Sequence, residues 1–550
     1  MTRTSDAQVD VADESPQRAP GPDVAAVRAR LLRPMPQDRW WGWLGPVFAG
    51  TVAAILRLVD LGRPHKFVFD ETYYAKDAFS LLRYGDARAF VDGADDQVLE
   101  GDLDIFTDQP SFVVHPTIGK WLIAGGIRLL GMEPAGWRLA TALAGVVTVV
   151  VVARVGRRLF RSTLLGTAAG LLLAVDGMAI TMSRTAILDG ILAMFVIAAF
   201  ACLLADRDWI RRRYADRLVA ADGGDSSPGA ASRPYLPVGI VAWRPWRPWR
   251  LAAGVLLGLA CATKWSGVYA LAVFGILTVC WEYGARRAAG GRSPLVTTVT
   301  RDAPVAFVTI VGSASAVYLA SWAGWIAGDD GWSRQWAASH PASGLAAVVP
   351  DWARSLWHYH DEMLGFHSGL DAPHDYASQA WGWLVLARPV SFDYASLEQG
   401  QAGCDVDRCS QAVLALGNPV LWWGGCVALL VCLWMWGARR DWRAGAILAG
   451  VAATWLPWFL FLGRTTFSFY AIAIAPFVVL AVAYALGLIL GPPDARPGRR
   501  TLGAAVAGAY VLSVVVVAAW FYPIHVDAVI AYEDWLKRMW FRTPGPWYWI

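Results

Sequence analysis

The chain alternates between long apolar segments and shorter polar segments that are rich in arginine. A helix needs about 20 consecutive apolar residues to cross a bilayer, and most of the apolar runs approach that length. Eleven runs qualify as candidate spans, at residues 43–61, 136–156, 163–182, 187–205, 250–264, 266–283, 304–326, 419–437, 445–462, 467–490 and 503–521. The pattern predicts an all-α polytopic membrane protein with about eleven transmembrane helices.

The placement of arginine predicts the orientation of these spans. If every run crosses, five arginine clusters fall on one side, at residues 154–161, 207–213, 286–292, 439–443 and 496–500. Loops rich in Lys and Arg stay in the cytoplasm, so this side is expected to be cytoplasmic. The same side holds residues 1–38, whose polar, proline-containing sequence predicts a disordered N-terminal tail.

One apolar segment, residues 116–131, does not fit this arrangement as a span. Counting it would invert everything downstream, and the segment is short and interrupted by Lys120 and Arg128. We therefore predict an interfacial helix on the outer face, which makes 62–135 one extracytoplasmic loop. The other expected regions are a membrane domain (39–525), a cytoplasmic loop (206–249), a second large extracytoplasmic loop (327–417) and an extracytoplasmic C-terminal tail (526–550).

Composition supports a membrane protein and excludes one class of partner. Hydrophobic residues make up 56% of the chain, charged residues 17%, and the mean hydropathy is +0.39. A net charge of +4 is too small to indicate nucleic-acid binding. Residues 222–229 have the composition of a flexible linker, and the basic, tryptophan-rich stretch 244–250 suits an anionic lipid surface. Cys404 and Cys409 lie close together in a polar loop, and would pair if that loop faces an oxidising compartment.

The first candidate for chemistry is the adjacent carboxylate pair Asp70 and Glu71, directly after the first span. Early acidic residues also favour a helix N-terminus, so a structural role is the alternative. Within the same loop, His115, Pro116 and Lys120 fit the start of a helix whose free N–H groups and cations would hold a phosphate. The alternative there is a capped amphipathic helix with a snorkelling lysine.

Several charged residues lie near the outer ends of the spans, namely Arg138, Asp176, Arg184, Asp189, Lys264 and Arg464. Charges at this depth usually face the bundle interior and mark a site. Arg138 and Arg184 are the second choices for binding a phosphate, although Arg184 would instead form a structural ion pair with Asp189. No cysteine or histidine spacing suggests a metal site.

Aromatic and histidine side chains in the long outer loop are candidates for binding a sugar or an acceptor. Aromatic faces pack against the C–H surfaces of a pyranose ring, and a lone loop histidine would be structural. The candidates are His367, His374, Tyr376 and Trp381, together with Tyr74 of the first loop.

In chain order, these motifs resemble the protein O-mannosyltransferase family, and most of all its bacterial, actinobacterial branch. The motifs are Phe69-Asp70-Glu71-Thr72-Tyr73-Tyr74, His115-Pro116-x-x-Gly119-Lys120, Trp137-Arg138-Leu139, Ser183-Arg184 with Leu188-Asp189, Ala262-Thr263-Lys264-Trp265-Ser266-Gly267 and His374-x-Tyr376-x-Ser378-x-x-Trp381. Each is weak alone, but their order across residues 40–525 is specific. Two departures stand out. Thr117 replaces a second proline after the His-Pro pair, and 327–417 is too short for the β-trefoil insertion of eukaryotic members.

The resemblance implies a GT-C fold in a plasma membrane, with an outward-facing site. The donor would be polyprenyl-phosphate-mannose, without cofactor or metal, and the acceptor a Ser or Thr hydroxyl of a secreted protein. We expect an inverting single displacement with Asp70 as general base and Glu71 supporting the acceptor or the loop, although either carboxylate could be the base. His115 and Lys120, then Arg138 and Arg184, would stabilise the phosphate.

Two other functions fit the sequence less well. A different GT-C enzyme would transfer a lipid-linked sugar to a lipid acceptor, but the His-x-Tyr-x-Ser-x-x-Trp loop favours a protein acceptor. A transporter would often show internal repeats, and none is visible. Acceptors would be unfolded while they cross the membrane, which suggests coupling to the Sec translocon, although no residue points to it.

Overall fold

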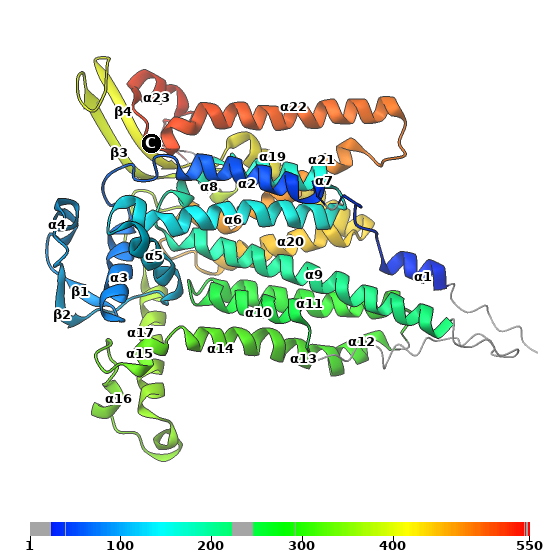
Figure 1. Ribbon diagram of the computed structural model, residues 1–550, viewed down its shortest axis with the longest axis horizontal. Helices are drawn as coiled ribbons and strands as arrows, with labels where there is room; N and C mark the ends of the chain where they lie inside the picture. Colours follow the sequence, from blue (N-terminus) through cyan, green and yellow to red (C-terminus); the bar gives the residue numbers. More distant parts are fainter. Residues whose placement is uncertain are drawn as a thin grey trace, which may run out of the picture.

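The computed structural model describes residues 24–38, 40–222, 246–291, 293–543, 545, 548 and 549. Long helices lie side by side in a bundle, and shorter elements gather across one end of it (Figure 1). The fold is therefore mostly helical, as predicted. Two small sheets, of order β1-β2 and β3-β4-β5, were not predicted, because their short strands carry no sustained alternation of apolar and polar residues.

Each of the eleven predicted spans coincides with helical structure. The elements are α2 (Trp41–Leu58), α6 (Pro134–Phe160), α7 (Thr163–Ala174) with α8 (Gly177–Ser183), α9 (Leu188–Asp222), α10 (Pro248–Cys261), α11 (Gly267–Ala288), α12 (Pro294–Thr297) to α14 (Ser313–Ala320), α19 (Pro419–Arg439), α20 (Trp442–Thr454), α21 (Ala475–Leu490) and α22 (Pro497–Phe521). Among the described residues, seven helices are long and apolar enough to cross a membrane, or eight if the bent pair α7–α8 counts as one. The chain is thus a multi-pass membrane protein.

Three spans depart from regular α-helix. α7 and α8 meet at 64°, because the chain breaks at Val175 and Asp176 starts α8 by accepting a hydrogen bond from the Ala179 N–H. The span from Pro294 to Ala320 passes through the π-helical turns η2 (Thr298–Asp302) and η3 (Val308–Gly312) on either side of α13 (Ala303–Phe307). After α20, the chain runs through the 3₁₀ turns η5 (Leu456–Leu460) and η6 (Ser468–Ala473) before α21 begins.

The first outer loop folds into α3 (Glu71–Tyr84), α4 (Ala94–Glu100) and α5 (Ile118–Leu130), with the ribbon of β1 (Arg88–Phe90) and β2 (Phe106–Pro110). α3 and α5 run across the end of the bundle, not along it (Figure 1). With 13 residues, α5 is too short to span a bilayer, and its position at the membrane interface stays a prediction.

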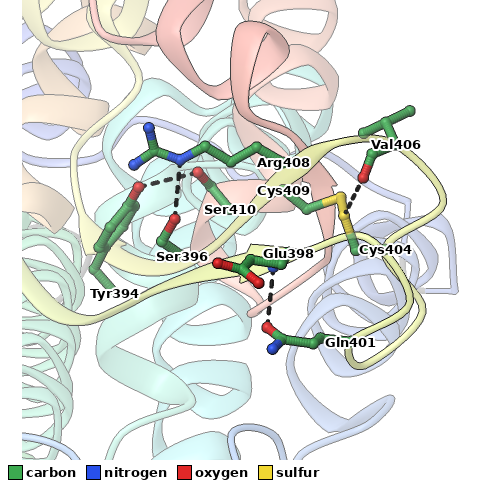
Figure 2. The surroundings of a disulfide bond; sticks show 9 residues. All are labelled: Tyr394, Ser396, Glu398, Gln401, Cys404, Val406, Arg408, Cys409 and Ser410. Carbon is green, nitrogen blue, oxygen red and sulfur yellow. Dashed lines mark hydrogen bonds between the residues drawn. A yellow bond between two sulfur atoms is a disulfide. The ribbon is translucent and has the colours of Figure 1, made fainter.

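The second outer loop contains helices and a hairpin. The helical elements are α15 (Ala323–Ala327), α16 (Trp336–Ser339), η4 (Gly344–Val348), α17 (Asp351–Gly369) and α18 (Ala380–Trp383). Strands β3 (Val390–Glu398) and β4 (Arg408–Ala415) then form an antiparallel hairpin that projects from the bundle end (Figure 1). Cys404 and Cys409 form a disulfide at its tip, and Arg408 donates to Ser396 Oγ across the strands (Figure 2).

Both termini are more ordered than a tail would be. Residues 24–31 form α1 (Val24–Leu31), which buries Val27 and Leu31 against the far end of α9. The prediction of a disordered tail over residues 1–38 is therefore wrong for this segment, and residues 1–23 lie outside the described part. After η7 (Tyr522–His525), the C-terminal segment adds β5 (Ile530–Ala531) to β4 and forms α23 (Tyr532–Arg538). Trp549 is buried and donates its indole N–H to the Leu386 carbonyl.

The predicted 206–249 loop also needs correction. α9 continues as a helix to Asp222, and residues 223–245 lie outside the described part together with most of the expected linker. Arg247 does not face lipid. It is buried and pairs with Asp206 and Glu282, because these two carboxylates need a partner inside the bundle.

Candidate active site

Asp70 lies where the chain turns from the first loop into α3. The preceding residue, Phe69, has a φ of 52°, a left-handed conformation that a bulky residue adopts only when its surroundings enforce it. The aromatic rings of Phe392, Phe467 and Phe469 pack around the Phe69 ring, at centroid distances of 5.1, 5.6 and 5.5 Å. This cluster fixes the turn that presents Asp70.

The Asp70 carboxylate is only weakly engaged. It makes no capping hydrogen bond to α3, and the Tyr74 hydroxyl lies 3.5 Å from Oδ2. Burial raises the pKa of Asp70 to about 6, against an opposing effect from Lys264 and a smaller supporting one from Asp189. A carboxylate with spare lone pairs and a raised pKa is suited to accept a proton near neutral pH.

Glu71, the neighbouring carboxylate, is fully buried and fully used. Arg138 donates to both of its oxygens at 2.8 Å, and the backbone N–H groups of Val68 and Ala186 donate at 3.0 and 2.8 Å. Glu71 thus ties the start of α3 to α6 and to the turn before α9. Its predicted role in supporting the loop fits these contacts, and they leave it no lone pair for an acceptor hydroxyl.

Two predicted phosphate ligands are occupied elsewhere, and we correct them. Arg138 also donates to the carbonyls of Leu61, Pro64 and Lys66, so its guanidinium is saturated inside the protein. Arg184 donates to the carbonyls of Arg57, Val59 and Asp60, where it caps the end of α2. The alternative ion pair between Arg184 and Asp189 is absent too, because Asp189 pairs with Lys264 at 2.8 Å.

Lys120 is also turned away from a free phosphate. Its ammonium group pairs with Asp77 at 3.0 Å, and both side chains are buried between α5 and α3. The cavity that Lys120 lines, of about 260 Å³, is a different one from the cavity beside His115. These contacts favour a role in docking α5 onto α3.

A cavity of about 550 Å³ combines a cationic end with apolar walls. The cationic end has Lys264 and Arg464 beside the neutral ring of His115, and the walls include Val268, Leu271, Ala314, Leu364 and Phe461. Arg464 uses Nε to bond the His367 carbonyl at 2.9 Å, and no carboxylate among the described residues forms an ion pair with it. Its loop is held by Thr465 and Thr466, which bond the backbone of Leu370, Ala372 and Ser378.

Two histidines line the same cavity. The His115 ring stacks on the His367 ring at 5.0 Å, and His367 donates from Nε2 to the Val114 carbonyl at 2.7 Å. His115 Nδ1 is buried without a hydrogen-bond partner among the described residues. Burial lowers the pKa of His115, with help from Lys264, and lowers that of His367 to about 4, so both rings are neutral at pH 7.

The other predicted sugar or acceptor residues are spread over the outer surface. Tyr74 is buried beside Asp70, and His374 packs against Phe69 at 5.9 Å, so both stay at the site. Tyr376 stacks under Arg388 at 4.9 Å. Trp381 is 55% exposed, and its part in an aromatic wall stays a prediction.

Sequence reasoning underrated Lys264 and Arg464. Both were recognised as charges near span ends, but neither was ranked as a phosphate ligand, because pairing decides which cations stay available. The described residues contain no group of three or more His, Cys, Asp or Glu that could hold a metal ion.

A helical bundle that carries a desolvated carboxylate and, at the same end, a cavity lined by cations and apolar side chains fits the class of GT-C membrane glycosyltransferases. In overall structure, the chain is similar to the protein O-mannosyltransferase Pmt1-Pmt2 complex of S. cerevisiae bound to the sugar donor. The TM-score is 0.66 at 14% identity, covering 98% of this chain and 97% of the other.

Family models and curated relatives extend the match to sequence. A model of the C-terminal four-transmembrane region of protein O-mannosyltransferases matches residues 352–544, and models of dolichyl-phosphate-mannose-protein mannosyltransferases match 114–218 and 240–285. The polyprenol-phosphate-mannose–protein mannosyltransferase of Mycolicibacterium smegmatis is 39% identical over 92% of this chain and 93% of its own length. That of Mycobacterium tuberculosis is 38% identical over 92% of both chains. The chain belongs to the protein O-mannosyltransferase family and is a glycosyltransferase, as the motifs predicted.

Proposed function

We propose that the protein transfers mannose from polyprenyl-phosphate-mannose to Ser or Thr hydroxyls of secreted proteins. The observation that supports this most directly is the weakly engaged Asp70 carboxylate, whose pKa is affected by Lys264, a residue that lines the 550 Å³ cavity. The donor's phosphate would lie against Arg464, Lys264 and His115. Its polyprenyl chain would follow the apolar walls, where burying each CH₂ group is favourable by about 0.8 kcal/mol.

The transfer follows a single displacement. Asp70 accepts the proton of the acceptor hydroxyl while the hydroxyl oxygen attacks C1 of mannose from the face opposite the phosphate. The bond between C1 and the phosphate oxygen breaks, its electron pair stays on the phosphate, and the configuration at C1 inverts. Arg464 and Lys264 stabilise the charge that develops on the leaving phosphate, so the proposal needs no cofactor.

Residues Lys264 and Asp189 together set the electrostatics of this step. Their ion pair, at 2.8 Å, holds the ammonium group 4.4 Å above the Tyr470 ring. The pair carries little net charge when no donor is bound, which lowers the cost of burying the lysine. A phosphate entering the cavity would compete with Asp189 for Lys264 and find Arg464 without a carboxylate partner.

The same proposal places the site on the extracytoplasmic side of the plasma membrane. The C-terminal ends of α6, α9, α11 and α19, which carry the arginine clusters of the sequence, lie at the bundle end remote from α3 and α5 (Figure 1). The positive-inside rule assigns that end to the cytoplasm. Secreted acceptors would then reach Asp70 while unfolded, and we extend the proposal to coupling with the Sec translocon, to be tested by photo-crosslinking from the β3–β4 hairpin.

The decisive experiment uses membranes that contain the full-length protein, radiolabelled polyprenyl-phosphate-mannose and a Ser/Thr/Pro-rich peptide. Asp70→Asn should reduce peptide labelling by roughly 10²–10⁴-fold, the contribution of a general base. Asp104→Asn is the matched control, because Asp104 is an exposed carboxylate of the same outer loop. Undiminished transfer by a normally inserted Asp70→Asn protein would refute the assignment, and label appearing only in lipid would indicate a lipid acceptor.

A further inference from the structure

A cluster of arginines surrounds Asp208 at the bundle end remote from Asp70. Arg161 and Arg158 approach the two carboxylate oxygens at 2.9 and 3.1 Å, and Arg207 lies 3.5 Å away. Another nitrogen of Arg161 lies against the thioether of Met35, which is a weak acceptor. One carboxylate therefore serves three guanidinium groups, contributed by α6, the turn after it, and α9.

The depth of this cluster follows from the length of α9. The helix begins at Leu188, next to the Asp189–Lys264 pair of the candidate site, and reaches Asp208 twenty residues later (208 − 188). At a rise of about 1.5 Å per residue this is about 30 Å, the thickness of the hydrocarbon core. Asp208 and its arginines thus lie where the phosphates of the opposite leaflet lie.

The positive charge around Asp208 is not balanced by the described residues. Arg211 and Arg33 add further repulsion at Arg207, beyond the three arginines that contact Asp208. Arg207 is only 6% exposed, and its Nε has no hydrogen-bond partner within the described part of the chain. A buried guanidinium without a full set of acceptors is costly, so the cluster needs additional negative charge.

Three other arginines at the same end, Arg247, Arg286 and Arg443, each have their own carboxylate partner. Arg247 pairs with two carboxylates, those of Asp206 and Glu282. Arg286 makes a two-point contact with Asp302, and Arg443 one with Asp441. Each of these three buried or half-buried arginines therefore has at least one carboxylate of its own, whereas the arginines around Asp208 share one.

We propose that Arg158, Arg161 and Arg207 bind the phosphate group of an acidic phospholipid in the leaflet opposite the Asp70 site. Arg158 and Arg161 are 33% and 18% exposed, so a headgroup can reach them from the bilayer. Arg207 lies behind them with its guanidinium 3.3 Å from the Trp442 ring centroid, which holds its plane. Basic pockets between membrane helices on this side are suited to anionic headgroups.

The test compares nanodiscs of phosphatidylglycerol with nanodiscs of phosphatidylcholine, each holding the purified full-length protein. Phosphatidylglycerol should raise the melting temperature of the wild type, and the double variant Arg158→Gln/Arg161→Gln should lose most of that increase. Native mass spectrometry should show retained phosphatidylglycerol weakened by on the order of fivefold for each guanidinium removed. Arg439→Gln/Arg440→Gln is the matched control, since both arginines are exposed at the same end.

A second variant changes the charge in the other direction. Asp208→Asn removes the only carboxylate that these arginines share, so its melting temperature should depend more strongly on phosphatidylglycerol than that of the wild type. Equal destabilisation in both lipids, or a full phosphatidylglycerol response in the double variant, would overturn the proposal. Inorganic phosphate added to phosphatidylcholine nanodiscs should have no effect, and stabilisation equal to that by phosphatidylglycerol would overturn the assignment to a lipid.

Discussion

The pH dependence of transfer is the sharpest test of the role of Asp70. A general base works when deprotonated, so kcat/KM should fall as the pH drops through its pKa in the free enzyme. With the pKa of Asp70 raised to about 6, the carboxylate is mostly ionised at pH 7. At pH 5 only about a tenth is ionised, so the rate should be about tenfold lower, whereas an aspartate with an ordinary pKa would stay almost fully ionised there.

Other groups in the cavity should not produce this acid limb. The pKa of His367 is lowered to about 4 by burial and that of His115 is also lowered by burial, so both lose their protons below the pH range in question. Asp527, outside the cavity, has a pKa raised to about 6 by burial and by Asp393. The variant Asp527→Asn is therefore the control, and it should keep the acid limb.

Removing the hydroxyl of Tyr74 should move the acid limb of the pH profile to higher pH. The hydroxyl stabilises the ionised form of Asp70 from 3.5 Å and so lowers its pKa. A contact this long is at the weak end of about 0.5–1.5 kcal/mol, so Tyr74→Phe should shift the limb up by roughly 0.4 pH unit. The assay is peptide mannosylation at peptide concentrations well below KM between pH 4.5 and 8.5, so that the rate follows kcat/KM. A flat profile down to pH 4.5 would refute a desolvated Asp70 as the base.

Three further predictions concern stability, donor binding and topology. Glu71→Gln leaves the buried Arg138 incompletely paired and should cost about 3–5 kcal/mol of folding free energy, measured by thermal unfolding in detergent. The control Asp534→Asn, which removes an exposed pair with Lys537, should cost less than about 1 kcal/mol. Equal losses in the two variants would contradict a structural role for Glu71. Arg464→Gln should raise the KM for the donor by on the order of tenfold, because it removes a charge-assisted contact to phosphate. The control Arg388→Gln should leave this KM unchanged. An unchanged KM in Arg464→Gln would show that Arg464 does not bind the donor. A membrane-impermeant maleimide should label Asp104→Cys but not Arg440→Cys in intact cells, and the reverse pattern would invert the proposed orientation.

Much of the fold could be predicted because membrane spans have a strong local signal. Hydrocarbon thickness sets the length of an apolar run and arginine marks its cytoplasmic side, so each of the eleven runs was found as helix. Residues 116–131 were set apart from the spans by their short length, by the charges of Lys120 and Arg128, and by the arginine placement downstream. The β3–β4 hairpin, and the pairing of the distant β5 with the end of β4, were not predicted.

The candidate site was predictable only in part. The motif placed Asp70 and Glu71 together but could not separate them, because adjacent residues at the start of a helix face different neighbours. Glu71 points into the protein toward Arg138 and Ala186, and Asp70 points toward Tyr74 and Lys264. The same holds for the four predicted phosphate ligands, His115, Lys120, Arg138 and Arg184. Their sequence positions do not show which of them are held by other groups of the protein, and only the folded chain does.

The sequence by itself determined that the protein is a multi-pass membrane glycosyltransferase with a charged outer loop, because span length, arginine placement and motif order are local properties of the chain. Only the tertiary structure decided which charges are free. Arg138, Arg184 and Lys120 donate to carbonyls or carboxylates from distant segments, whereas Arg464 lines a cavity without a carboxylate partner among the described residues and Asp70 has only a long contact with Tyr74. The physical reason is that a buried charge must be satisfied by whatever lies next to it in space, and neighbours in space are not neighbours in sequence.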